Sequence, residues 1–206
     1  HVRSRRQRQM CIRDSLHDDG LLALPMVTHA AAARMGFMCI PFVRFLEVPR
    51  NVISAETVLE ASDPQSVYDL VSDVSRHSRL DGSGTVQRRV AGPERADVGD
   101  RVTQSMRLYG IPYRISFTVT RAEPGRAFAW RMPTGHTWTW EVEPTEGGGV
   151  LVRETFDARP ARLLGLPLAG IFRLNGSFVR NRKGIATSLA RLHRTVPRGR
   201  GLSHGS

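Results

Sequence analysis

The stretch "HTWTWEVEPTEGGGVLVRETFD" (residues 136–157) decides the fold, because it consists of two alternating runs joined by a glycine turn. Strict alternation of apolar and polar residues is typical of strands with one buried face. The apolar face of the first run holds His136, Trp138, Trp140 and Val142, and that of the second holds Val150, Val152, Glu154 and Phe156. A hairpin turn near Gly147 pairs Trp138 with Phe156 and Trp140 with Glu154.

Five more short alternating runs precede this hairpin, each ended by a turn signal of Gly, Pro or Asp. They are residues 52–60, 85–90, 101–108, 113–120 and 127–131. Together with 136–143 and 150–157 they predict seven strands. Because the last six are joined by short connections, we expect an antiparallel meander.

Two segments have helical rather than strand spacing. Ser62-Asp63-Pro64 is a helix start, and the apolar residues 67, 70, 71 and 74 follow it at helical intervals. After Pro160, one helical stripe contains Ile171, Leu174, Phe178, Ile185, Leu189 and Leu192. This pattern predicts a long C-terminal amphipathic helix, interrupted early by Gly165-Leu166-Pro167. The helix is the cover that the apolar face of the sheet requires, so the fold class is α+β.

The order of these elements resembles the START-like (SRPBCC) superfamily of polyketide cyclases/dehydrases and lipid-transfer proteins. The resemblance lies in "ASDPQSVYDLVSDVSRHSRLDGSGTV" (61–86), "VGDRVTQSM" (98–106) and "GGVLVRETFDARP" (148–160). It implies the helix-grip fold, a curved seven-stranded antiparallel sheet wrapped around the C-terminal helix. Members often carry an aromatic residue just after the first helices, where this chain has His77 to Asp81. The superfamily contains binders, transporters and enzymes, so the fold does not choose among them.

Composition and charge exclude several classes of protein. The 206 residues contain no apolar run long enough for a membrane span, and the two cysteines, Cys11 and Cys39, lie near one end. A disulfide scaffold is therefore not expected, and a reducing cytoplasm is the default location. The net charge of +11 comes mostly from the two ends of the chain, so we expect no nucleic-acid partner.

The ends of the chain are expected to lie outside the folded domain. Met10 to Ser15 match one reading frame of a transposon end used in sequencing libraries, so residues 1–15 are expected to be adapter read-through; a disordered basic arm is the alternative. Residues 16–50 are expected to be a non-native or disordered leader, since Pro25 and His29 interrupt any signal-peptide run. The START-like domain is expected at 51–196, followed by a disordered tail at 197–206.

The inward faces of the strands predict an apolar cavity with a few polar groups. The expected ligand-binding residues are Gln104, Met106, Phe117, Trp130, His136, Trp138, Trp140, Glu154, Phe156 and Phe178. The strand of Trp138 and Trp140 has no interleaved basic residues, which favours a pocket wall over a base-stacking platform. Arg180, Arg182 and Lys183 are expected to be a solvated face of the helix. A weak membrane-surface role of that helix is the alternative, without stable insertion.

Glu154 and His136 are the candidate catalytic residues. A carboxylate among apolar neighbours is costly, so Glu154 is either a ligand contact, an acid or base with a raised pKa, a structural hydrogen bond, or a strand-end group that reaches water. We expect its partners to be Gln104, His136, the indole of Trp140 or Arg131. His136 is able to polarise a ligand carbonyl, or it is simply half-exposed beside its turn.

Three functions are compatible with these residues. The first is binding of a small hydrophobic ligand of lipid, isoprenoid or polyketide type in a cavity between sheet and helix. The second is a cyclase/dehydrase-like enzyme that uses the same cavity. The third is a regulatory interaction module without a ligand. No metal and no nucleotide cofactor are expected, because no metal-ligand cluster or phosphate loop is present in the sequence; a homodimer is compatible with it.

Overall fold

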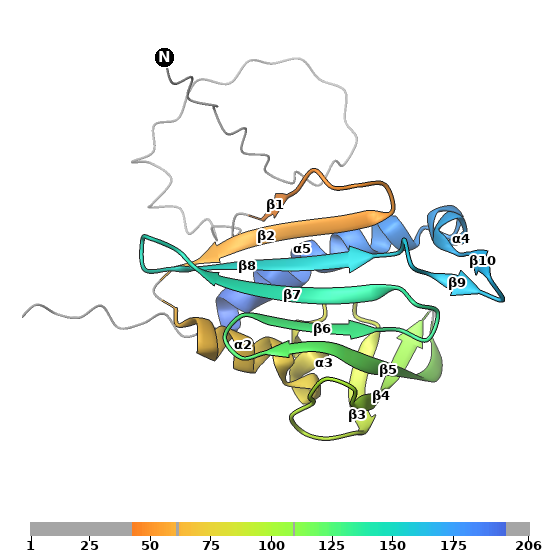
Figure 1. Ribbon diagram of the computed structural model, residues 1–206, viewed down its shortest axis with the longest axis horizontal. Coiled ribbons are helices and arrows are strands. Elements are labelled where there is room, and N and C mark those ends of the chain that lie inside the picture. Colours follow the sequence, from red (N-terminus) through yellow and green to blue (C-terminus); the bar gives the residue numbers. More distant parts are fainter. Residues whose placement is uncertain (1–42, 61, 109, 197–206) are drawn as a thin grey trace, which may run out of the picture.

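The computed structural model describes residues 43–60, 62–108 and 110–196 as one α+β fold (Figure 1). One antiparallel sheet has the strand order β1-β2-β8-β7-β6-β5-β4-β3. Its strands are β1 (Arg44–Phe45), β2 (Val52–Leu59), β3 (Val86–Ala91), β4 (Arg101–Leu108), β5 (Ile111–Glu123), β6 (Ala127–Arg131), β7 (Thr137–Pro144) and β8 (Val150–Asp157). A separate two-stranded hairpin consists of β9 (Arg162–Leu163) and β10 (Leu166–Pro167). The helices are α2 (Pro64–Ser72), η1 (Val74–Arg76), α3 (His77–Leu80), α4 (Ala169–Leu174) and α5 (Ser177–Thr195).

The predicted meander is confirmed, but the sheet has eight strands instead of seven. The additional strand is β1, whose Arg44 pairs with Glu56 and whose Phe45 pairs with Ala55. Val43 and Phe45 pack against the core, so the fold includes residues upstream of the expected boundary at 51. Two residues without alternation are too short a strand to be recognised from sequence. The expectations for residues 1–15 and 197–206 lie outside the described residues, as do residues 16–42 of the expected leader.

The register of the β7–β8 hairpin agrees with the prediction from its alternation. Trp138 pairs with Phe156 and Trp140 with Glu154. Phe128 and Trp130 of β6 then pair with Trp140 and Trp138. The aromatic side chains of three neighbouring strands therefore lie on the same inner face of the sheet, because directly paired residues point to the same side.

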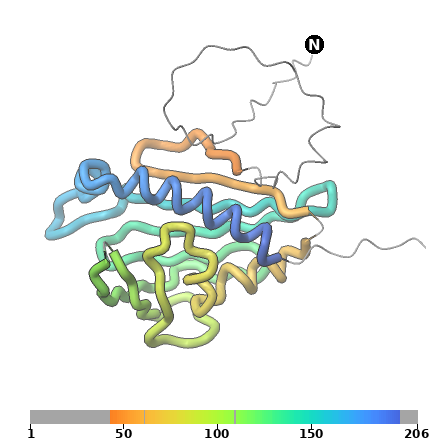
Figure 2. Tube along the Cα trace, turned by 180° about the vertical axis from the view of Figure 1, so that it is seen from behind, coloured from red at the N-terminus to blue at the C-terminus, as the bar shows by residue number. Residues whose placement is uncertain are grey.

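Helix α5 lies across that inner face and forms the cover that the sequence predicts (Figure 2). Its fully buried residues Ile185, Leu189 and Leu192 join the main core. The predicted stripe is wrong at its beginning, because Ile171 and Leu174 belong to the separate helix α4 and are exposed. Gly176 has a φ of 73° and separates the two helices. None of the described helices is both long and apolar enough to cross a lipid bilayer.

Helix α2 begins as its sequence predicts. Asp63 is the N-cap and accepts a hydrogen bond from the backbone amide of Ser66 at 2.9 Å, and Pro64 follows in the first turn. Val67 and Val71 are fully buried beneath the helix. Helix α2 therefore packs beside β6 and β7, whereas α3 lies against β3 and α5.

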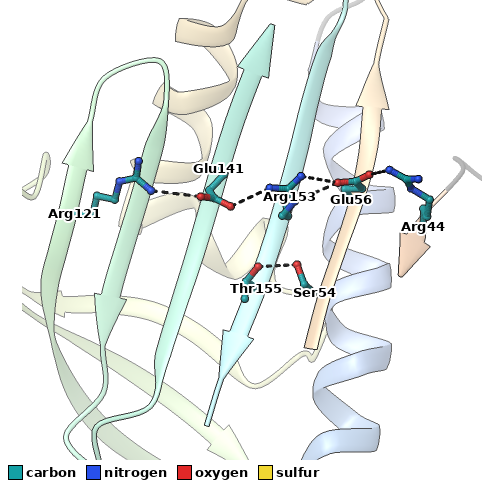
Figure 3. A network of polar contacts seen from close by, with 7 residues as sticks. All are labelled: Arg44, Ser54, Glu56, Arg121, Glu141, Arg153 and Thr155. Carbon is teal, nitrogen blue, oxygen red and sulfur yellow. Dashed lines mark hydrogen bonds and ion pairs between the residues drawn. The ribbon is translucent and has the colours of Figure 1, made fainter. Parts of the chain in front are cut away.

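The outer face of the sheet carries a ladder of alternating charges (Figure 3). Arg121, Glu141, Arg153, Glu56 and Arg44 follow one another from β5 to β1. Glu56 is 2% exposed and binds both Arg44 and Arg153. Burial raises the pKa of Glu56, but the hydrogen bonds from the two arginines outweigh that effect and hold the pKa below its ordinary value.

Candidate functional site

A pocket of about 260 Å³ lies between the inner face of the sheet and helix α5. Nine of the ten predicted ligand-binding residues line it: Gln104, Met106, Phe117, Trp130, His136, Trp138, Trp140, Glu154 and Phe156. Phe178 does not line it; its ring lies 5.6 Å from that of Phe156, and the residue packs against the main core. Further lining residues come from α3, the loop after it, α4 and α5, and the sequence did not predict them as ligand contacts; they include His77, Asp81, Phe172 and Ser188.

The walls of the pocket are aromatic rings in mutual contact. The ring of Trp130 lies 5.6 Å from that of Phe117 and 5.9 Å from that of Phe128. The ring of Trp138 lies 4.9 Å from that of Phe156. Such pairs add attraction beyond the burial of their area, so the wall is a preformed apolar surface.

Glu154 is the polar exception in this wall. Its side chain is 6% exposed, and its Oε2 atom has no hydrogen-bond partner. Burial raises the pKa of Glu154 well above its ordinary value, and the negative charge of Asp81 raises it further, while a hydrogen bond with Ser188 opposes the rise. Burial therefore favours the protonated form of Glu154, and one of its two oxygens has no hydrogen-bond partner.

Ser188 of α5 is the residue that holds Glu154. Its Oγ accepts a hydrogen bond from the backbone amide of Gly82 at 2.9 Å, so its own hydrogen is directed to the carboxyl group. The sequence contained a signal for this contact, since Ser188 interrupts the apolar stripe between Ile185 and Leu192. The chain thus places a hydroxyl group of α5 beside the carboxyl group of Glu154 in β8.

The partners expected for Glu154 are engaged elsewhere. Gln104 donates from Nε2 to the carbonyl oxygen of Val74 at 3.4 Å. His136 Nδ1 shares a hydrogen bond of 2.8 Å with the hydroxyl of Thr134. Within the described structure, neither Trp140 nor Arg131 makes a hydrogen bond with Glu154. The prediction of these partners was wrong because it considered only residues of the strands and of the turn before β7, whereas the actual partner comes from helix α5.

His136 lies at the α4 end of the pocket. Its ring is in edge contact with Phe156 at 5.5 Å and with Phe172 at 5.3 Å. Burial lowers its pKa to about 4, so the imidazole is neutral above this pH. A neutral imidazole is a potential proton acceptor and a hydrogen-bond partner for a ligand.

His77 occupies the place where the resemblance implies an aromatic residue. Its ring lies 5.2 Å from that of Trp130, and its Nε2 is 2.8 Å from the carbonyl oxygen of Val71. Because a carbonyl only accepts, Nε2 carries the proton of the neutral ring. Burial lowers the pKa of His77, which keeps the ring uncharged and part of the wall.

The described residues contain no group of three or more His, Cys, Asp or Glu side chains arranged to hold a metal ion. Glu154 and Asp81 are the acidic residues of the pocket lining, and the other carboxylates of the sheet belong to its outer face. The chemistry that this site supports is therefore apolar contact, hydrogen bonding and proton transfer.

Comparison with known proteins gives one family. The family described as polyketide cyclase / dehydrase and lipid transport matches residues 52–196. The uncharacterized protein Rv0088 of Mycobacterium tuberculosis is 35% identical over 146 residues, which cover 71% of this chain and 65% of that protein. The uncharacterized protein MT0096 from another strain of the same organism is 34% identical over the same length. The chain spans just under two thirds of the length of these curated relatives.

Solved structures show the same fold at low sequence identity. Protein Ms6760 from Mycobacterium smegmatis superposes with a TM-score of 0.52 at 13% identity, over 74% of this chain and 99% of that one. A protein from Rhodobacter sphaeroides gives a TM-score of 0.54 at 12% identity, over 74% and 95% of the two chains. Protein CV1439 from Chromobacterium violaceum gives 0.50 at 18% identity, over 71% and 97%.

Proposed function

The chain belongs to the polyketide cyclase/dehydrase and lipid transport family, and from that premise we propose that it binds one small hydrophobic molecule in the pocket under α5. The aromatic wall supplies the affinity, since burial of apolar ligand surface contributes about 25 cal/mol per Å². The pocket volume of about 260 Å³ is close to the lower end of the range for small-molecule sites. A compact isoprenoid or polyketide suits this volume better than a lipid with two long chains.

The observation that carries the proposal is the unpartnered Oε2 of Glu154. A buried polar atom without a partner is unfavourable, and a ligand that supplies the missing bond removes that cost. In its protonated form, which burial favours, this carboxyl group is both a donor and an acceptor. The ligand is therefore expected to present a carbonyl or hydroxyl group to Glu154 and hydrocarbon to the rings around it.

His136 gives the ligand a second point of contact, far from the first. Glu154 is paired with Trp140, and His136 precedes Trp140 by four positions. At about 3.3 Å per residue, the two groups are roughly 13 Å apart along the strand. A molecule that engages both therefore has two polar ends separated by an apolar middle.

The test is native mass spectrometry of the full chain, expressed with its own host's lipids and metabolites present. The expected result is a bound hydrophobic molecule that survives gentle desolvation and is identified after extraction. Titration with 1-anilinonaphthalene-8-sulfonate then compares the wild type with Glu154→Leu and with the outer-face control Glu143→Gln. Loss of the co-purified molecule in Glu154→Leu, but not in Glu143→Gln, supports the proposal; a ligand-free chain that excludes the dye contradicts it.

A cyclase/dehydrase-like enzyme is the second candidate, and one observation favours it. The pocket holds a carboxyl group whose pKa is raised by burial and an imidazole whose pKa is lowered by burial to about 4. Two groups with pKa values displaced in opposite directions are the pattern of an acid and a base in one site. If Glu154→Gln retains the co-purified molecule but no longer converts it, the enzyme is supported over the carrier.

The third candidate, an interaction module without a ligand, is the outcome if purified protein is always empty. A cytoplasmic location, a homodimer and the lack of a nucleic-acid partner remain predictions. Light scattering of the purified full chain tests the homodimer, and a gel-shift assay with duplex DNA at physiological salt tests the lack of nucleic-acid binding.

A further inference from the structure

One end of the molecule exposes an unusual number of large aliphatic side chains. Six of them lie between the end of β8 and the first turn of α5: Leu163, Leu164, Leu166, Ile171, Leu174 and Val179. Leu164 is 96% exposed and Leu174 is 91% exposed. The β9–β10 hairpin and α4 that carry most of them project together beyond the sheet (Figures 1 and 2). Single exposed aliphatics are ordinary on protein surfaces, but a group of this kind marks a contact surface.

The backbone conformation at Leu164 is unfavourable for a leucine, so the stability of the fold does not explain why a leucine is found at this position. Leu164 and Gly165 form the two-residue turn between β9 and β10, with φ values of 49° and 80°. A turn with positive φ at both positions prefers Asn, Asp or Gly at the first, since other side chains are strained there. Leu164 is unfavourable for two reasons, namely its strained backbone conformation and the exposure of its side chain to water. A contact with a partner outside the chain would explain both.

Helix α4 supports the same conclusion from its two sides. Its inner side is anchored by Phe172, which packs on His136 and Phe156, and by the buried Ala169. Its outer side presents Ile171 and Leu174 to solvent. A helix that is apolar on both sides is expected to have a partner on both sides.

The segment that forms this end is basic. Residues 158–183 contain six arginines and lysines and no acidic residue. Within the described part of the chain, Arg162, Arg173 and Lys183 make no ion pair. Arg162 donates to backbone carbonyls of Arg159 and Ala161, and Arg173 donates to the side chain of Asn51, so both guanidinium groups keep their full positive charge.

We propose that this end, formed by residues 162–183, docks on the surface of an anionic lipid bilayer. Aliphatic side chains surrounded by arginine and lysine suit the boundary between acyl chains and negative headgroups. The contact is peripheral. It adjoins the pocket, because Phe172, Ser177 and Arg180 line the pocket from the same segment. A docked molecule thus has its pocket wall at the bilayer, the reservoir of hydrophobic molecules.

The experiment is co-sedimentation of the full chain with vesicles of phosphatidylcholine alone and with phosphatidylglycerol added, at low and at high salt. The variant is the double substitution Leu164→Asn with Leu174→Gln, which leaves buried residues unchanged and suits the turn at 164. The control is Val98→Asn, an exposed aliphatic in the β3–β4 loop at the far edge of the sheet. Thermal melts of all three proteins confirm that the substitutions leave the fold intact.

The expected result is binding to the phosphatidylglycerol vesicles that weakens at high salt, with partitioning reduced by about tenfold or more in the double variant. Val98→Asn is expected to bind as the wild type does. Equal binding of the double variant, or no binding of the wild type to anionic vesicles at low salt, overturns the proposal. So does a wild-type dimer that ignores vesicles and that the double variant converts to a monomer. Because no pocket ligand is used, an empty or inactive pocket leaves these results unaffected.

Discussion

At the scale of single residues, Glu154 is expected to make stability depend on pH. Its pKa in the folded chain is raised by burial above the ordinary value of 4.5. The unfolded chain therefore loses the proton first, and stability falls as the pH rises from about 4.5 toward the folded pKa. Glu154→Gln keeps the shape without the titration, so its melting temperature is expected to decline less than that of the wild type as the pH rises above about 4.5. An unchanged pH profile, measured against Glu143→Gln as control, contradicts a raised pKa of Glu154.

His136 is expected to reduce stability as the pH falls, whereas Glu154 reduces it as the pH rises. Its pKa falls from 6.5 to about 4 in the folded chain, because burial disfavours the imidazolium. The unfolded chain therefore binds the proton first as the pH falls below 6.5, and stability is lost down to about pH 4. His136→Gln is expected to retain about 2–3 kcal/mol more of its neutral-pH stability at pH 4 than the wild type does. Urea unfolding at the two pH values measures this; parallel losses in both proteins are the contrary outcome.

The sequence showed which residues of the site are unusual, but not what they contact. Glu154 was recognisable because a charge interrupts an otherwise apolar face, and its pairing with Trp140 followed from hairpin geometry. Its bond to Ser188 was not predictable, because the residues are 34 positions apart and on elements whose relative rotation only tertiary packing fixes. The direction of a pKa shift depends on burial, which alternation alone does not measure.

At the scale of elements, the β9–β10 hairpin is expected to become more stable when its tip is changed. Leu164 has a φ of 49°, which is unfavourable for a leucine by about 1–2 kcal/mol and is tolerated by asparagine. Leu164→Asn is therefore expected to raise the free energy of unfolding by about 1 kcal/mol, or the melting temperature by roughly 2–4 °C. Calorimetry of the two proteins is the measurement. A lower melting temperature would mean that Leu164 has a structural contact after all.

A second prediction at the scale of elements concerns the charge ladder on the outer face of the sheet. Arg153→Met removes one of the two cations that neutralise the buried Glu56, and leaves only Arg44. Since an uncompensated buried carboxylate is unfavourable, the expected loss is about 2 kcal/mol of unfolding free energy. Arg121→Met, at the more exposed end of the ladder, is the matched control and is expected to cost no more than about 0.5 kcal/mol. Equal losses in both would show that Glu56 gains little from Arg153.

Strand periodicity predicted the sheet well, whereas the segment between sheet and helix was harder. Seven strands followed from alternation, and β1 did not, because two residues carry no period. The stripe of Ile171 and Leu174 was assigned to the buried face of one long helix; the left-handed Gly176 breaks that helix and turns both residues outward. The same apolar residues suit a core or an external contact, and sequence does not distinguish the two.

At the scale of the whole molecule, the loop after α3 and helix α5 both line the pocket, and they meet at two glycines. A Cβ on Gly82 would lie 2.1 Å from the carbonyl oxygen of Gly184 and 2.5 Å from Cβ of Thr187. These are backbone and rigid side-chain atoms, so Gly82→Ala has to displace the helix from the sheet. A Cβ on Gly184 would instead meet Ser83 at 3.4 Å, which is an ordinary contact. The two glycines of one interface are therefore expected to respond differently to the same substitution.

Gly82→Ala is expected to lower the free energy of unfolding by about 2–3 kcal/mol, or the melting temperature by roughly 5–10 °C. It also disturbs the amide that holds Ser188, and with it the orientation of Glu154, so dye binding in the pocket should weaken together with stability. Gly184→Ala is expected to stay within about 1 kcal/mol of the wild type, because alanine favours the helix by about that amount and compensates a tighter contact. Calorimetry and dye titration of both variants test the pair. If Gly184→Ala is as damaging as Gly82→Ala, the helix is not held at Gly82, and the pocket under α5 is closed by some other contact.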